Sequence, residues 1–410
     1  MKIFYGWRIV FAGGAIQLLQ GLLLHHAFGA YFAVLIEERG WSKTALSGAA
    51  AMQPLEAAML GPVMGWMVDR FGSQGIIRAG IVIFGIGFML LSQIDTLLGF
   101  YAAYFVIALG SSLCGNFAIS VTIIQWFEKR RARALSAVQF GSALGGMLVF
   151  IIAWSLQYYG WRATAFTSGA IAILIGWPMA RIIRSRPEEL GETIDGLPPG
   201  ATNAAPATDT DKIAPAPQRE FTTREALRTS AFWLISLGHG FALLVVMAVL
   251  VHAITHIKEG LGYSIAEASF VITLVTTGQL GGVLLGWFIG DRFDKRLVCA
   301  ACMLMHAGGM LLLTYATGPL MLASFAILHG VAWGLRGPFM QAIRADYFGR
   351  KSIGMIIGLS SLIIVIGQIG GPVIAGAMAD WTGNYRAGFT LLAVLAGLGS
   401  LFFLMAKRPE

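Results

Sequence analysis

The chain contains one short pattern twice, each time at the end of a long apolar stretch. The first copy, GWMVDRFG, covers residues 65–72, and the second, GWFIGDRF, covers 286–293. The two Asp-Arg pairs begin at positions 69 and 291, which is an offset of 222 residues. A charged pair followed by a tight turn is typical of a short loop between two membrane-spanning helices. The repeat therefore predicts two copies of one membrane unit that face each other.

The apolar composition excludes a soluble globular fold. Hydrophobic residues make up 57% of the chain and charged residues only 12%, whereas soluble domains contain about 25% charged residues. Uncharged runs of roughly 20 residues or more, the length that a spanning helix needs, recur along the whole chain. They predict an all-α membrane protein with twelve spans: 9–36, 44–68, 74–94, 96–127, 134–161, 163–182, 229–257, 268–290, two within 297–335 that separate near 317–319, 352–379 and 387–406.

Polarity divides the chain into three parts. Residues 1–183 are expected to form one six-helix bundle and 229–410 the other, joined by a polar linker over 184–228. The linker contains Pro-rich segments and eight acidic residues, so we expect it to be mostly disordered. A short amphipathic helix is predicted near Thr222–Arg228.

The basic residues predict the orientation in the membrane. With the N-terminus inside, 23 of the 29 Lys and Arg residues fall on the cytoplasmic side, as the positive-inside rule requires. Both termini are then cytoplasmic, and the net charge of +8 reflects orientation and not nucleic-acid binding. The expected location is a bacterial inner membrane.

The duplicated six-helix unit, the Gly-x-x-x-Asp-Arg-Phe-Gly element and the central linker resemble the major facilitator superfamily over essentially the whole chain. Within it, Tyr5–Arg8, Phe28–Phe32 and Gly40–Gly48 resemble bacterial relatives of the monocarboxylate and oxalate/formate carriers. The resemblance implies a monomeric secondary transporter that works by alternating access without a cofactor. Monocarboxylate carriers use an acidic residue and an arginine in helix 8, but residues 268–290 contain neither. The substrate chemistry of that family therefore does not transfer residue by residue.

Arg336 is the leading candidate for substrate binding, because it lies inside the tenth predicted span. A guanidinium there costs on the order of 2.5–3.5 kcal/mol on insertion scales, so such residues usually face a cavity or a partner. Gly334, Gly337 and Pro338 are expected to open the helix beside it. The alternative is that Arg336 extends toward the cytoplasm and pairs with Asp346 or stabilises the inner gate.

Asn116 is expected to face Arg336 across the bundle. The internal offset of 222 carries position 116 to 338, two residues from Arg336, and two donors from opposite halves suit a carboxylate. The alternative is a bond from Asn116 to the backbone of a neighbouring helix. Further candidates are polar or aromatic groups in helices that line the cavity in the family: Trp333, Tyr31, His25, His26, His239 and His329.

Acidic residues suggest coupling and gating. Glu56 is the sole carboxylate well inside a span, where burial without a cation keeps it protonated, so it is the candidate proton carrier; a structural bond to helix 11 is the alternative. Asp69, Arg70, Asp291 and Arg292 are predicted to form the cytoplasmic gate. No metal is expected, since His252 and His256 have no Cys or carboxylate nearby.

These residues predict a carrier of a small organic anion, most plausibly a monocarboxylate, with proton coupling as a further hypothesis. The second half has one cation and no anion in its membrane core, so an empty site is electropositive. The chain contains no motif of a nucleophilic or metal-dependent enzyme, and the linker is too short for a signalling domain. An efflux carrier of amphiphilic compounds is the alternative.

Overall fold

The computed structural model describes residues 4–41, 43–196 and 219–409, and this part of the chain is helical without any strand. In the N-terminal half the helices are α1 (Tyr5–Gln20), the π-helix η1 (Gly21–His25), α2 (Phe28–Arg39), α3 (Lys43–Phe71), α4 (Ser73–Leu91), α5 (Leu97–Cys114), α6 (Asn116–Trp126), α7 (Arg131–Met147) and α8 (Val149–Ile182). The C-terminal half contains α9 (Thr223–Leu227), α10 (Ser230–Thr255), the π-helix η4 (His256–Gly260), α11 (Ile265–Ile289), α12 (Lys295–Thr314), α13 (Pro319–Phe348), α14 (Ile353–Thr382) and α15 (Arg386–Met405).

These helices make up the twelve predicted spans. Ten segments of the described chain are long and apolar enough to cross a membrane. One of them, Arg131–Ile182, contains 52 residues and turns at Gly160, where φ is 75°, so it makes two crossings. The 29-residue α3 supplies the twelfth. The twelve-helix architecture is confirmed.

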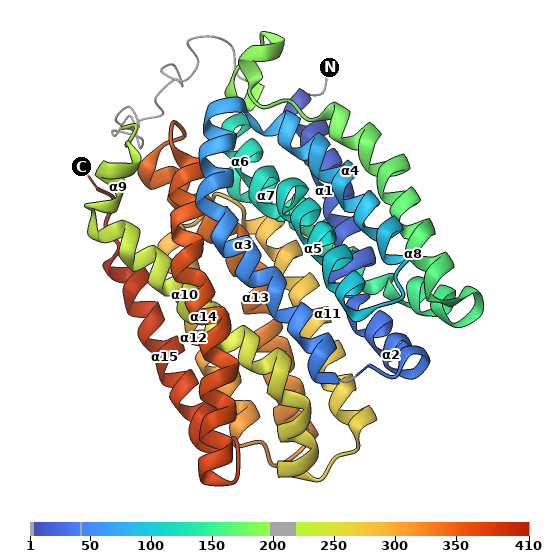
Figure 1. Ribbon diagram of the computed structural model, residues 1–410. Coiled ribbons are helices and arrows are strands. Elements are labelled where there is room, and N and C mark those ends of the chain that lie inside the picture. Colours follow the sequence, from blue (N-terminus) through green and yellow to red (C-terminus); the bar gives the residue numbers. More distant parts are fainter. Residues whose placement is uncertain (1–3, 42, 197–218, 410) are drawn as a thin grey trace.

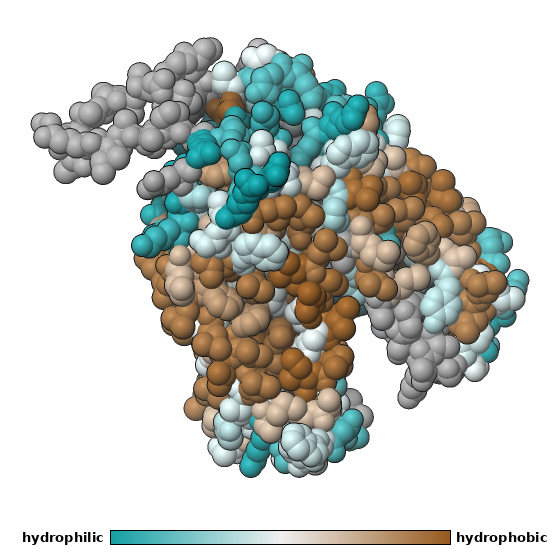
Figure 2. All heavy atoms as spheres, turned by 60° about the vertical axis from the view of Figure 1, so that its left-hand side comes forward, coloured by the Kyte–Doolittle hydropathy of each residue, from teal (hydrophilic) through white to brown (hydrophobic). Residues whose placement is uncertain are grey.

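The helices form two bundles that lie side by side (Figure 1). Both termini lie at one end of the molecule, which we call the termini side; the other end is the far side. Figure 2 shows an apolar belt with polar residues at both ends, as expected of a chain that crosses a bilayer. In this view the surface is deeply hollowed between the bundles at the far side. The bundles therefore separate at the far side and close at the termini side.

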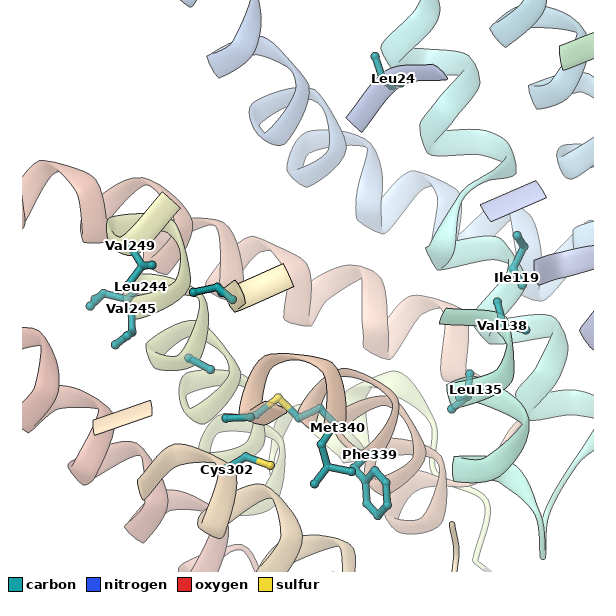
Figure 3. Close-up of a cluster of buried hydrophobic side chains, with 14 of the residues drawn as sticks. Leu24, Ile119, Leu135, Val138, Leu244, Val245, Val249, Cys302, Phe339 and Met340 are labelled. Atoms are coloured by element: carbon teal, nitrogen blue, oxygen red, sulfur yellow. The ribbon is translucent and has the colours of Figure 1, made fainter. Parts of the chain in front are cut away.

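Close backbone packing joins the two bundles along α3 and α14. Gly61 and Gly65 on α3 lie against Gly358 and Gly354 on α14. A Cβ at Gly65 would collide with the Gly354 backbone, and a Cβ at Gly61 would collide with the Ser361 hydroxyl. Small residues four apart allow this approach, which matters in a membrane because lipid is as apolar as the side chains. Figure 3 shows the apolar side chains that fill the interior, from Leu24 in the first bundle to Phe339 in the second.

The first part of the linker, residues 184–196, is held against the first bundle. The Glu192 carboxylate accepts a hydrogen bond from the backbone N–H of Tyr5 (3.2 Å). Asp195 accepts from the N–H groups of Glu128 (3.1 Å) and Lys129 (2.8 Å). Acidic side chains thus bind backbone donors at the termini side, and this fixes residues 184–196, while 197–218 lie outside the described residues. The predicted amphipathic helix is present as α9.

Asp69, at the end of α3, caps a helix of the opposite bundle. Its two carboxylate oxygens accept from the N–H groups of Gly354 and Met355, both at 2.9 Å. These residues lie in the first turn of α14, where N–H groups have no partner within the helix. A carboxylate at this end is further favoured by the helix dipole.

Asp291, at the corresponding position after α11 in the second bundle, caps a helix of the first bundle. It accepts from the N–H groups of Ala132 (3.1 Å) and Arg133 (3.3 Å) in the first turn of α7. Positions 132 and 133 are 222 residues before 354 and 355, which is the offset of the sequence repeat. The two bundles therefore exchange equivalent caps.

Charged groups surround these caps at the termini side. Asp346 pairs with Arg131 and with Lys295, the latter at 2.8 Å, and Lys295 also contacts Asp291 at 2.9 Å. The Arg133 guanidinium lies 4.2 Å from the ring centre of Trp287. Hydrogen bonds between Gln125 and Arg350 also join the two halves at this side.

The two arginines expected in the gate, Arg70 and Arg292, point to the surface and not to the opposite bundle. Arg70 is exposed and lies over the rings of Trp66 and Phe71 on its own helix. Arg292 is also exposed. In the described structure the aspartates, and not these arginines, carry the contact between the bundles.

At the far side, two arginines of the first bundle pair with one aspartate. Arg39 and Arg162 contact Asp95 at 2.8 and 2.7 Å, so the ends of three spans are held together. These guanidinium groups hold the pKa of the Asp95 carboxyl below its usual value.

Removing either interbundle cap should shift the protein away from the arrangement that is open at the far side. We expect Asp69→Ala and Asp291→Ala each to cost that state about 1 kcal/mol, a roughly fivefold change in population. Spin labels at positions 93 and 317, both exposed at the far side, report the change as a shorter distance between the bundles.

Asp294→Ala is the matched control, because Asp294 caps its own helix by accepting from the N–H of Arg296 (2.8 Å). It should leave the distance distribution unchanged. An equal shift in all three variants would contradict the role of the interbundle caps.

Candidate substrate cavity

A cavity of about 150 Å³ lies between the two bundles. Four of the predicted substrate residues line it, namely Arg336, Asn116, Trp333 and His239. The remaining lining residues are Ser120, Leu135, Gln139, Leu243, Gly337, Pro338 and Gln341. We call this space the central cavity.

An interruption of the fourth span brings Asn116 to the cavity. The sequence predicts one continuous helix over 96–127, but the chain breaks at Gly115, which has extended backbone angles (φ −85°, ψ −161°). A Cβ at this position would collide with the carbonyl oxygen of Ser111. That oxygen instead accepts from the Gln20 amide nitrogen at 2.9 Å. A glycine and a buried amide from α1 thus make the break possible, and Asn116 becomes the first residue of α6.

Neighbouring side chains orient the Asn116 amide. Its oxygen accepts from the Gln17 amide nitrogen (3.2 Å) and from the Ser120 hydroxyl (3.4 Å). Asn116 is exposed and lines the cavity. Because the oxygen is occupied, the amide nitrogen is left to donate into the cavity. The expected alternative to ligand binding was a bond to a helix backbone, whereas this bond joins two side chains and sets the direction of the donor.

Arg336 is buried without a carboxylate. It is 1% exposed, its Nη1 atom lies 3.3 Å from the Met340 sulfur, and its Nε has no partner in the described structure. Asp346 pairs with Arg131 and Lys295, so the alternative that Arg336 pairs with Asp346 is wrong. A guanidinium held in this way lacks the strong acceptors that usually compensate its burial.

The helix that carries Arg336 is not opened as the sequence predicts. α13 runs without interruption from Pro319 to Phe348, with Pro338 inside it. Gly334 serves close packing, since a Cβ there would collide with the Gln279 carbonyl oxygen on α11. Gly337 has no described atom within 4 Å of where its Cβ would lie, so it leaves room in the cavity. The interruption occurs in the equivalent helix of the other half, at Gly115.

Arg344 is a second buried cation of this helix, although the orientation count includes it among the 23 basic residues on the cytoplasmic side. It is 2% exposed. Its guanidinium donates to the Met340 carbonyl (2.9 Å) and the Ser360 hydroxyl (2.9 Å), and it lies 3.1 Å from Nδ1 of His239. Its spacing of eight residues from Arg336 places both on a similar helix face, a signal that could have indicated burial.

The other predicted substrate residues do not line the described cavity. Tyr31 is buried in the first bundle, with its hydroxyl 3.4 Å from that of Ser168. His329 is buried against His306, with their Nδ1 atoms 3.1 Å apart. His25 and His26 are exposed at the interruption between η1 and α2.

Glu56 lies in α3 beside the fourth span. It is 7% exposed, and one carboxyl oxygen accepts from the Ser112 hydroxyl at 3.3 Å. The other oxygen is buried and has no partner among the described residues. The expected structural bond to the eleventh predicted span, α14, is replaced by a bond to α5, and among the described residues no cation contacts the carboxyl.

The His252 and His256 side chains bind backbone oxygens. His252 Nε2 lies 3.0 Å from the Pro372 carbonyl, and His256 Nε2 lies 3.1 Å from that of Leu313. Across the described residues, no three His, Cys, Asp or Glu side chains are grouped as metal ligands. These histidines join helices at the far side.

The chain matches the sequence model of the Major Facilitator Superfamily over residues 9–255 and 236–410. It is 23% identical to the membrane sensor protein UhpC of Escherichia coli, covering 85% of this chain and 81% of that protein. Bovine monocarboxylate transporter 13 is also 23% identical, over 98% of this chain and 89% of the relative. The crystal structure of the human organic anion transporter MFSD10 superposes with a TM-score of 0.73 at 14% identity, covering 97% and 99% of the two chains. At this identity the structural likeness shows the fold.

Proposed function

The chain belongs to the major facilitator superfamily and is a membrane transporter of small substrates, not an enzyme; we propose that its substrate is a small organic anion of the monocarboxylate class. One chain supplies both walls of the central cavity, so we expect the monomer to be the functional unit. Alternating closure of the two bundles around the cavity would move the anion across the membrane.

The buried Arg336 guanidinium is the observation that carries this proposal. It lines the cavity, it lacks a carboxylate partner, and the described lining contains no acidic residue. A carboxylate in the cavity would accept charge-assisted hydrogen bonds, which are about twice as strong as neutral ones. The Asn116 amide nitrogen approaches the same space from the other bundle.

The same lining disfavours the efflux alternative. Arg336, Asn116, Ser120, Gln139 and Gln341 give the cavity a polar wall, whereas sites for drug-sized ligands are mostly apolar. A cationic amphiphile would also meet the Arg336 charge. The names of monocarboxylate transporter 13 and the organic anion transporter MFSD10 fit the anion proposal.

We further propose that the termini side faces the cytoplasm of a bacterial cell and that the protein lies in its inner membrane. The exposed basic residues at the termini side support this orientation. In intact spheroplasts a membrane-impermeant thiol reagent should label Gln93→Cys, at the far side, and should not label Arg292→Cys. Labelling of position 292 would contradict the orientation.

Arg336→Ala should lose carboxylate binding, because no other cation lines the cavity in the described structure. The loss of a desolvated charge contact is worth roughly 2–5 kcal/mol, or at least about thirtyfold in affinity. Arg336→Lys keeps the charge but not the planar fork, so its transport should also fall steeply. Thermal-shift screening against formate, acetate, pyruvate, L-lactate and benzoate, followed by uptake into proteoliposomes, measures both effects.

Arg408→Ala removes an exposed positive charge near the C-terminus and is the matched control. Normal carboxylate binding by Arg336→Ala would refute the anion proposal. Preferential stabilisation by organic amines would favour the efflux alternative. Binding without transport would indicate a sensor, the role named for the relative UhpC.

We propose Glu56 as the proton carrier, because its carboxyl is buried and receives only a neutral hydroxyl donor. Glu56→Gln should then abolish uptake driven by a pH gradient while counterflow exchange persists, since exchange requires no net proton movement. Ser112→Ala leaves the carboxyl in place and should retain gradient-driven uptake. Unchanged gradient-driven uptake in Glu56→Gln would remove Glu56 from the mechanism.

A further inference from the structure

We propose that Arg344 holds His239 in the neutral form that carries its proton on Nε2, so that His239 donates this N–H to an anion bound at Arg336. The inference rests on the proposed function and adds a positioning residue and a third donor to that site. Arg344 itself is absent from the cavity lining. It acts through the imidazole.

Three helices fix the position of the Arg344 guanidinium. Nη1 donates to the Met340 carbonyl on α13, and Nη2 donates to the Ser360 hydroxyl on α14, both at 2.9 Å. The Ser360 hydroxyl lies 2.8 Å from that of Ser236 on α10. Ser236 and His239 are three residues apart on α10 and therefore share a face. The network closes on the helix that carries the imidazole.

The contact between Arg344 and His239 allows one protonation state of the ring. Nη2 of Arg344 lies 3.1 Å from Nδ1 of His239. A guanidinium has only donors, so Nδ1 must accept and cannot carry a proton. Nη2 has two hydrogens, one for Ser360 and one for His239. An imidazolium would place an N–H against the guanidinium and add a second positive charge, and so the proton of the neutral ring lies on Nε2.

The remaining ring nitrogen is available to a ligand. His239 is half-buried and lines the cavity together with Arg336 and Asn116. Its Nδ1 is occupied by Arg344, and Nε2 has no hydrogen-bond partner within the described chain. The cavity then offers the Arg336 cation on α13 together with two neutral donors whose direction is fixed by a neighbour, His239 on α10 and Asn116 on α6. A carboxylate has two oxygens with about four acceptor positions and can use all three.

Nitrogen NMR of ¹⁵N-histidine-labelled protein tests the protonation state without any ligand. The His239 signals are identified by their loss in His239→Gln. We expect an unprotonated Nδ1 and a protonated Nε2 in the wild-type protein. Arg344→Met should shift the ring toward the other tautomer or a mixture, and Arg344→Lys, which retains a donor, should restore the wild-type signals in part. A proton on Nδ1 in the wild-type protein overturns the proposal.

Binding of L-lactate tests whether the N–H serves the anion. His239→Leu should weaken binding about tenfold, whereas His239→Gln keeps a donor near Nε2 and should bind within about threefold of wild type. Arg344→Met should weaken binding about tenfold in the wild-type background and less than twofold in the His239→Gln background. Equal losses in both backgrounds would show that Arg344 acts by its charge and would overturn the proposal.

A second variant separates positioning from folding. Ser360→Ala removes one anchor of Arg344 and should produce a smaller tautomer shift than Arg344→Met, at an unchanged melting temperature. If wild-type protein binds neither L-lactate nor the other carboxylates, the proposed function fails. The NMR signals still decide the tautomer in that case, so the two failures are distinguishable.

Discussion

The structure depends on two aspartates that cap helices of the opposite bundle. Asp69 binds the first turn of α14, and Asp291 binds the first turn of α7. Each carboxylate satisfies N–H groups that have no partner within their own helix. Because the caps are made only when the termini-side ends meet, they favour the arrangement that is hollowed at the far side (Figure 2). Packing of glycines between α3 and α14 brings the backbones close enough for the first cap.

The two buried guanidinium groups near the central cavity differ in how far hydrogen-bond acceptors compensate their burial. Arg344 has three uncharged acceptors, whereas Arg336 has only a methionine sulfur. The first guanidinium is therefore suited to holding other groups in place, and the second to binding a ligand that brings the missing charge. The Asn116 amide is oriented by Gln17 in the same way that His239 is oriented by Arg344. Each half thus contributes a neutral donor whose direction is set by a neighbour outside the cavity lining.

The two halves have the same design but have diverged at the cavity. Position 115 in the first half corresponds to 337 in the second, and both are glycine. Gly115 interrupts its span because Gln20 satisfies the carbonyl that the break releases. Gly337 lies in an unbroken helix. A similar glycine therefore has different consequences, since the partner amide is present in only one half.

The sequence by itself determined the spans, the duplication and the presence of a cation in the membrane core. These follow from composition and spacing, because each spanning helix satisfies its own backbone and needs only length and apolarity. The placement of Arg336 and Asn116 around one cavity was also predictable from the 222-residue offset. Only the tertiary structure decided that Tyr31 and His329 turn away from the cavity, that Asp346 pairs with Arg131 and Lys295, and that Arg344 is buried. These outcomes depend on which face of a helix meets which neighbour, and that choice is made by contacts far apart in the chain.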